Sequence, residues 1–99
     1  MKPVDMERTI SGTRYSTAKA EVVAHDCYWD GHNFERHGHN TYLYKTAKGN
    51  FFTVRLTQWE GELDTLEPTT REEAMELWDS LPEHEMEWEE AFGVAAVEA

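Results

Sequence analysis

The sequence predicts an α+β fold, an antiparallel β-meander of three to four strands with one or two C-terminal helices packed on it. Two β-rich runs flank a four-residue turn in the middle of the chain, and a helix-capping signal follows them. The 99 residues, 12% of them aromatic, suffice for the core of one small domain. We therefore expect a single domain over residues 1–99, with residues 1–5 flexible and residues 93–99 forming a tail.

The N-terminal part shows weaker patterns. Residues 7–11 are rich in β-branched side chains and predict a short strand that ends at Gly12. Residues 20–29 are ambiguous, because their alanines and first glutamate suit a helix whereas their valines and aromatic residues suit a strand. We predict a strand there. Residues 30–40 contain glycines and asparagines with little apolar content, which indicates an exposed loop.

The clearest element is a hairpin. Residues 41–46 and 51–57 are the two β-rich runs, and residues 47–50 between them include Gly49, which can take the positive φ of a bulged hairpin turn. In the second run one face carries Phe52, Val54 and Leu56, and the other carries Thr53, Arg55 and Thr57. We expect the first of these faces to be core and the second to be wet.

A fourth strand and a helix follow the hairpin. We expect the strand over residues 62–66, before Pro68. A capping box starts the helix, formed either by Thr69 with Glu72 or by Thr70 with Glu73. The stripe of apolar residues at i, i+3, i+4 and i+7 consists of Ala74, Leu77, Trp78 and Leu81.

This helix should stop at Pro82. We expect Leu77 and Trp78 to pack it onto the face of the hairpin that carries Phe52, Val54 and Leu56. Residues 83–92 are expected to form a second helix, which Gly93 terminates.

Acidic residues concentrate in the C-terminal part of the chain. Residues 1–59 carry eight Lys/Arg and six Asp/Glu, whereas residues 60–99 carry fourteen acids and one base, Arg71. Such a block is either a solvated face or a docking surface for a basic partner, and large apolar neighbours such as Trp88 favour docking. The residues predicted to bind the partner are Glu72, Glu73, Glu76, Asp79, Glu83, Glu85, Glu87, Glu89 and Glu90.

Composition excludes several other classes. The net charge of −11 argues against direct binding of nucleic acid or of an anionic membrane. We expect neither a transmembrane span nor a signal h-region, because no apolar stretch is long enough. The single cysteine excludes an intrachain disulfide framework and fits the cytoplasm of a host cell.

Four histidines and the cysteine fall within residues 25–39. His25 and Cys27 would share one face of a strand, and His37 and His39 have the same spacing. The chain has neither a C-x-x-C pair nor an H-E-x-x-H helix, so we predict no metal and no other cofactor. The alternative is a metal-binding or regulatory module that uses His25, Cys27, His37 and His39.

Catalytic signatures are absent from the sequence. Cys27 has His25 nearby, but no third group is positioned by pattern to orient the imidazole. There is no Walker loop and no Rossmann fingerprint. We predict that the protein is not an enzyme.

Three motifs resemble a family of small proteins from phages and mobile elements. Its members look like Y-x-T-x-x-A, then L-Y-x-T-x-x-G-x-F-F, then P-L-T-x-x-E-A with a tryptophan. The matching segments are residues 15–20 (YSTAKA), 42–52 (YLYKTAKGNFF), 66–74 (LEPTTREEA) and Trp78. The resemblance implies a β-meander followed by a helix, and no functional residues carry over.

Proteins of this setting often resemble inhibitors of host defence, and the chain is similar in size and charge to anti-CRISPR proteins. We therefore expect a non-enzymatic, anti-CRISPR-like inhibitor, whose acids mimic a row of phosphates and block the nucleic-acid-binding site of a basic host protein such as a CRISPR effector subunit. It would act as a monomer or a homodimer.

Overall fold

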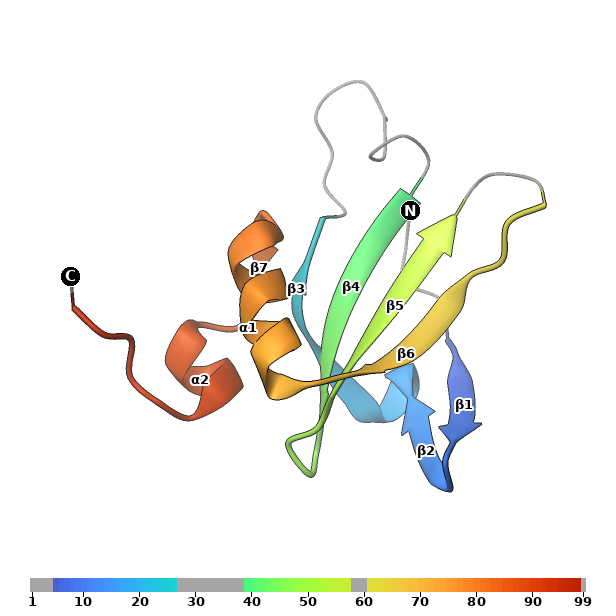
Figure 1. Cartoon of the computed structure of the whole chain (residues 1–99), viewed down its shortest axis with the longest axis horizontal. Coiled ribbons are helices and arrows are strands. Elements are labelled where there is room, and N and C mark those ends of the chain that lie inside the picture. Colours follow the sequence, from blue (N-terminus) through green and yellow to red (C-terminus); the bar gives the residue numbers. More distant parts are fainter. Residues whose placement is uncertain (1–4, 27–38, 58–60, 99) are drawn as a thin grey trace.

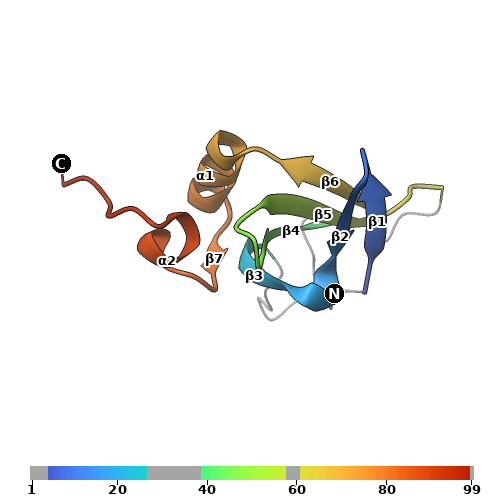
Figure 2. The same ribbon diagram turned by 90° about the horizontal axis from the view of Figure 1, so that it is seen from below.

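The computed structural model describes residues 5–26, 39–57 and 61–98, and these residues form an α+β fold (Figure 1). A five-stranded antiparallel sheet has the order β6-β5-β4-β3-β7, and a separate two-stranded sheet pairs β1 with β2. The helices α1 and α2 lie on one side of the large sheet and the β1–β2 hairpin lies on the other (Figure 2). The elements are β1 (Glu7–Ile10), β2 (Thr13–Ser16), the 3₁₀ turn η1 (Thr17–Lys19), β3 (Ala20–His25), β4 (His39–Thr46), β5 (Phe51–Thr57), β6 (Thr65–Thr69), α1 (Arg71–Ser80), β7 (Glu83–His84) and α2 (Trp88–Phe92).

The central hairpin is confirmed. β4 and β5 pair antiparallel around a turn in which the Thr46 amide donates to the Asn50 carbonyl at 2.8 Å and Gly49 has a φ of 86°. β4 starts earlier than predicted, because His39 and Asn40 pair with the end of β5. The predicted loop over residues 30–40 is therefore wrong at its last two positions, and its other residues lie outside the described part.

The predicted strand over residues 20–29 is confirmed for β3, and residues 27–29 lie outside the described part. β3 contains a register irregularity between Val22 and Ala24. The extra residue lets both Val23 and Ala24 reach the core on the helix side, where they are fully buried.

Both faces of the large sheet carry core residues. The prediction that Phe52, Val54 and Leu56 form a core face is confirmed. The predicted wet face is wrong at Thr53, although Arg55 is exposed as predicted, and the predicted packing of the helix on the Phe52 face is wrong. The face with Phe52, Val54 and Leu56 contacts the β1–β2 hairpin, where the Tyr15 ring meets the Phe52 ring at 5.7 Å. The helices instead cover Leu43 and Phe51 on the opposite face. Leu77 and Trp78 pack there, and Thr53 is buried rather than wet, because neighbouring residues of a strand point to opposite faces.

The sequence predicted only the first strand of the β1–β2 hairpin. The chain reverses at Ser11 and Gly12, whose φ values are 51° and 80°, as a tight two-residue hairpin loop requires. The second strand, TRYS, is too short to show an alternating pattern.

The fourth strand lies later than predicted. β6 occupies Thr65–Thr69, with Leu66 fully buried opposite Val54. It includes Pro68, which the sheet tolerates because β6 is an edge strand.

Helix α1 is confirmed, and its capping box is formed by Thr70 and Glu73. The Thr70 hydroxyl accepts from the Glu73 amide at 3.1 Å, and the Glu73 carboxylate accepts from the Thr70 amide at 3.0 Å. The helix ends at Ser80, with Leu81 as its C-cap just before Pro82. In the described ranges, no helix is long and apolar enough to cross a membrane.

The predicted second helix over residues 83–92 is wrong in its first half. Residues 83–84 form β7, and the amides of Glu85 and Met86 both donate to the Val23 carbonyl. These backbone amides therefore form hydrogen bonds at the edge of the sheet and not within a helix. Only α2 is helical, and Gly93 caps it in the left-handed conformation as predicted. Residues 94–98 lie outside helices and strands and are exposed.

Candidate functional site

Helix α1 presents a ridge of acids on its outer side. Glu72, Glu76 and Asp79 recur at i, i+4 and i+7, so they lie on one side of the helix. The apolar stripe that includes Ala74 faces the sheet on the other side, and the three acids are exposed. This arrangement follows from helical spacing alone.

The other acids predicted to bind a partner come from different elements. Glu83 lies in β7, Glu85 and Glu87 lie between β7 and α2, and Glu89 and Glu90 lie in α2. They do not form the ridge of a second helix. α1, β7 and α2 nevertheless lie together on one side of the molecule (Figures 1 and 2).

Aromatic contacts hold these three elements together. The Trp78 ring stacks on the His84 ring with centroids 3.6 Å apart, and it meets the Trp88 ring edge-on at 5.6 Å. The Trp78 indole N–H also donates to the Met86 carbonyl at 3.0 Å. At the start of α1, the Arg71 guanidinium donates to the Phe92 carbonyl. The acids of α2 are thus held in a defined position relative to those of α1.

Three of the nine predicted acids have partners within the chain. Glu73 belongs to the capping box, Glu85 contacts His25 Nε2 at 2.9 Å, and Glu89 accepts from the Ala96 amide at 3.3 Å. The other six side chains are exposed and make no hydrogen bond or ion pair with the described part of the chain. We call them the acidic surface, which consists of Glu72, Glu76, Asp79, Glu83, Glu87 and Glu90.

The charges of α1 act differently at its two ends. Negative charges in the first turn interact favourably with the helix dipole and stabilise the helix. The hydrogen bonds with Thr70 hold the pKa of Glu73 below its ordinary value. Asp79 lies in the last turn, where a negative charge opposes the dipole and no basic residue offsets it. The acidic ridge therefore extends along the whole helix at a cost to helix stability.

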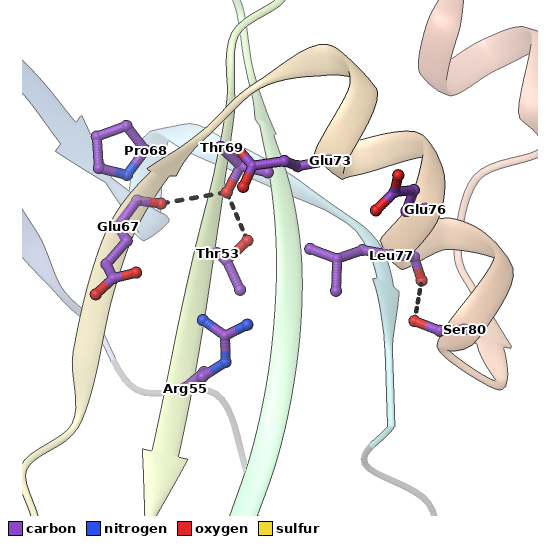
Figure 3. A pocket seen from close by; sticks show the side chains of 9 residues that line it. All are labelled: Thr53, Arg55, Glu67, Pro68, Thr69, Glu73, Glu76, Leu77 and Ser80. Atoms are coloured by element: carbon purple, nitrogen blue, oxygen red, sulfur yellow. Dashed lines mark hydrogen bonds between the residues drawn. The ribbon is translucent and has the colours of Figure 1, made fainter.

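A polar pocket of about 430 Å³ lies beside α1, over β5 and β6 (Figure 3). Its floor carries the Thr53 and Thr69 hydroxyls, 2.6 Å apart. Arg55 is exposed, and its guanidinium makes no hydrogen bond or ion pair with the described residues. Three carboxylates complete the charged lining, from Glu67, Glu73 and Glu76. The sequence did not predict this pocket, because it depends on which face of the sheet the helix covers.

The two described histidines among the candidate metal ligands, His25 and His39, lie apart. His25 pairs with Tyr42 in the sheet, and His39 lies three residues before Tyr42, so the two histidines point to opposite faces. His25 contacts Glu85, and His39 Nε2 lies 2.7 Å from a Glu62 carboxylate oxygen. The other candidate ligands, Cys27 and His37, lie outside the described residues. Within the described ranges no group of three or more His, Cys, Asp or Glu is placed to hold a metal ion.

Comparison of the chain with protein-family models, with curated proteins and with solved structures found no match.

Proposed function

We propose that this protein is a non-enzymatic binding protein whose acidic surface occupies the basic nucleic-acid-binding site of a host-defence protein, such as a CRISPR effector subunit. The observation that carries the proposal is the set of six exposed carboxylates on α1, β7 and α2 with no partner in the described chain. A carboxylate that supports the fold usually has such a partner, as Glu73 does.

The spacing of the ridge suits a site built for phosphates. Glu72 and Asp79 are seven residues apart, which corresponds to about 10 Å of helix axis, and Glu76 lies between them. One strand of a duplex carries a charge every ~3.4 Å of its axis. The ridge, with a charge about every 5 Å, therefore offers anions at intervals of the same order as a nucleic-acid backbone.

Apolar side chains accompany the acids. Trp88 is half-buried between them, and Val94 and Val97, which follow α2, are 48% and 95% exposed. Protein interfaces combine apolar contacts with polar groups at their rim. This combination supports docking onto a protein.

The cost of Asp79 also supports the proposal. A negative charge at the C-terminal end of a helix destabilises it, and the last turn of α1 contains no basic residue. Local choices that oppose the fold are typical of functional sites. The position of Asp79 is thus better explained by binding than by folding.

A displacement experiment tests the proposal. A labelled oligonucleotide is bound to purified CRISPR effector complexes, and its fluorescence anisotropy is followed as the protein is added. We expect displacement by the parent protein and about tenfold weaker displacement by the triple variant E72Q/E76Q/D79N, since each charge contributes up to ~1 kcal/mol. The advantage of the parent should shrink as salt is raised.

The matched control is D5N/E7Q/D64N, which removes three exposed acids on β1 and in the segments before β1 and β6, away from the acidic surface. We expect it to behave as the parent does. Equal displacement by the two triple variants would refute the acidic surface as the binding site. Failure of the parent to displace any of the oligonucleotides would refute the proposed target.

A further inference from the structure

A second pocket, of about 440 Å³, lies between the β1–β2 hairpin and the β4–β5 turn. Its charged lining consists of Arg14, Lys19 and Lys48, and no acid contributes to it. This is unusual in a chain with 20 acids and 9 bases. We call this site the basic pocket.

Two of its cations are unpaired. The ammonium groups of Lys19 and Lys48 make no hydrogen bond or ion pair with the described part of the chain. Arg14 Nε lies 3.5 Å from a Glu7 carboxylate oxygen, with both side chains more than half exposed. An arginine has five N–H donors, so this contact leaves most of them available.

Hydrogen bonds hold the backbone of the pocket in place. In the β4–β5 turn, the Gly49 amide donates to the Thr46 carbonyl at 2.9 Å and the Asn50 amide donates to the Thr46 hydroxyl at 3.0 Å. On the other wall, the Thr17 amide donates to the Met6 carbonyl at 3.0 Å and so fixes the turn that carries Lys19. The backbone on both walls is therefore ordered without a ligand, which lowers the entropic cost of binding.

Polar groups without charge complete the lining. The Thr13 and Thr46 hydroxyls and the side-chain amide of Asn50 can donate hydrogen bonds to an anion beside the lysines. A neighbouring depression shares Lys19 and Thr46 with the pocket but is also lined by Glu21 and Glu90. Those two acids would repel an anion, so they confine it to the side of Arg14 and Lys48.

We propose that the basic pocket binds a small phosphate-bearing anion. Lysine and arginine bind phosphate through charge-assisted hydrogen bonds, and hydroxyl and amide donors complete such sites. The volume of the pocket lies in the range of small-molecule sites, roughly 300–1,000 Å³. The ligand that fits is a free nucleotide or a similar small molecule. The end of a nucleic-acid strand carries the same group and is the alternative that the test distinguishes. The inference does not depend on the acidic surface.

The test is a titration of ¹⁵N-labelled full-length protein followed by amide NMR at physiological salt. The probes are inorganic pyrophosphate, ATP and a 5′-phosphorylated oligothymidylate. We expect pyrophosphate and ATP to produce saturable shifts confined to residues 13–19 and 46–50. The K19Q/K48Q variant should bind about tenfold more weakly, and K48Q alone should lose affinity.

The matched control is R55Q, which removes one positive charge as K48Q does but from the pocket beside α1. We expect its affinity for pyrophosphate to equal that of the parent. The spectrum of each variant also reports whether it is folded. Absence of saturable shifts, equal losses in K48Q and R55Q, or binding of the oligonucleotide alone would each overturn a small-anion site.

Discussion

Replacing Trp78 tests the contact that holds the acidic surface together. The side chain is half-buried against the core on the helix side and contacts His84, Met86 and Trp88. Trp78→Ala removes one hydrogen bond, worth about 1 kcal/mol, and two ring contacts worth ~0.5–1.5 kcal/mol each. With the lost apolar contact, we expect the free energy of unfolding to fall by about 3 kcal/mol, near the lower end for large aromatic residues.

Trp78→Phe separates the ring from its polar group. It keeps an aromatic ring against His84 and Trp88 but leaves the Met86 carbonyl without its donor. We expect a loss of about 1 kcal/mol. The control is Leu63→Ala, because Leu63 is 86% exposed and its replacement should change stability by less than ~0.5 kcal/mol.

The assay is urea denaturation followed by far-ultraviolet circular dichroism, which does not depend on tryptophan fluorescence. A domain of this size has a stability of about 5–15 kcal/mol, so the Trp78→Ala variant should still show a folded baseline. A loss below about 1 kcal/mol for Trp78→Ala would refute the reasoning, since it would mean that Trp78 does not anchor α1 to β7 and α2.

Four further outcomes are expected. Thr70→Ala removes the side-chain cap of α1 and should lower the free energy of unfolding by about 1 kcal/mol in the same assay, whereas Thr70→Ser should restore most of it. Asp79→Lys should raise the free energy of unfolding by ~0.3–1 kcal/mol, because a positive charge in the last turn interacts favourably with the helix dipole. It should also weaken the displacement of nucleic acid, because it reverses one charge of the acidic surface. The hydrogen bond with His39 holds the pKa of Glu62 below its ordinary value, so Glu62 stabilises the fold above that ordinary pKa and loses this contribution as the pH falls through its lower folded pKa. His39→Gln should move the carboxyl titration, followed by NMR, back toward the ordinary value. Elemental analysis of the purified protein should find no stoichiometric zinc, and a metal whose removal by chelation lowers the thermal stability would contradict this.

The elements that the sequence predicted well are those specified by local signals. The β4–β5 hairpin has long β-rich runs around a glycine turn, and α1 has both a capping box and an apolar stripe. The segment from Glu83 to Glu87 was predicted wrongly as helix. Its composition favours a helix, but its backbone forms hydrogen bonds with the edge of β3 instead. Whether this segment forms a helix or pairs with β3 depends on a strand some sixty residues earlier, so the local sequence pattern cannot predict it.

The candidate sites differ in the same way. The ridge on α1 follows from helical spacing alone, so the sequence predicted it. The pocket around Arg55 and the basic pocket with Lys19 and Lys48 each join residues from separate elements. The sequence places Arg55 on a predicted strand and Lys48 in a predicted turn, but it assigns Lys19 to no element. The residues that line each pocket come together only because the β1–β2 hairpin and α1 pack on opposite faces of the sheet.

The two edges of the large sheet affect how the protein behaves at high concentration. A strand from another molecule that approached β6 would meet Pro68, which has no N–H to offer. On the far edge, β7 is only two residues long and includes the exposed Glu83. Neither edge offers a long, uncharged row of backbone groups for a foreign strand to extend. We therefore expect the molecule to resist the growth of fibrils by strand addition, even though more than a third of its residues are hydrophobic.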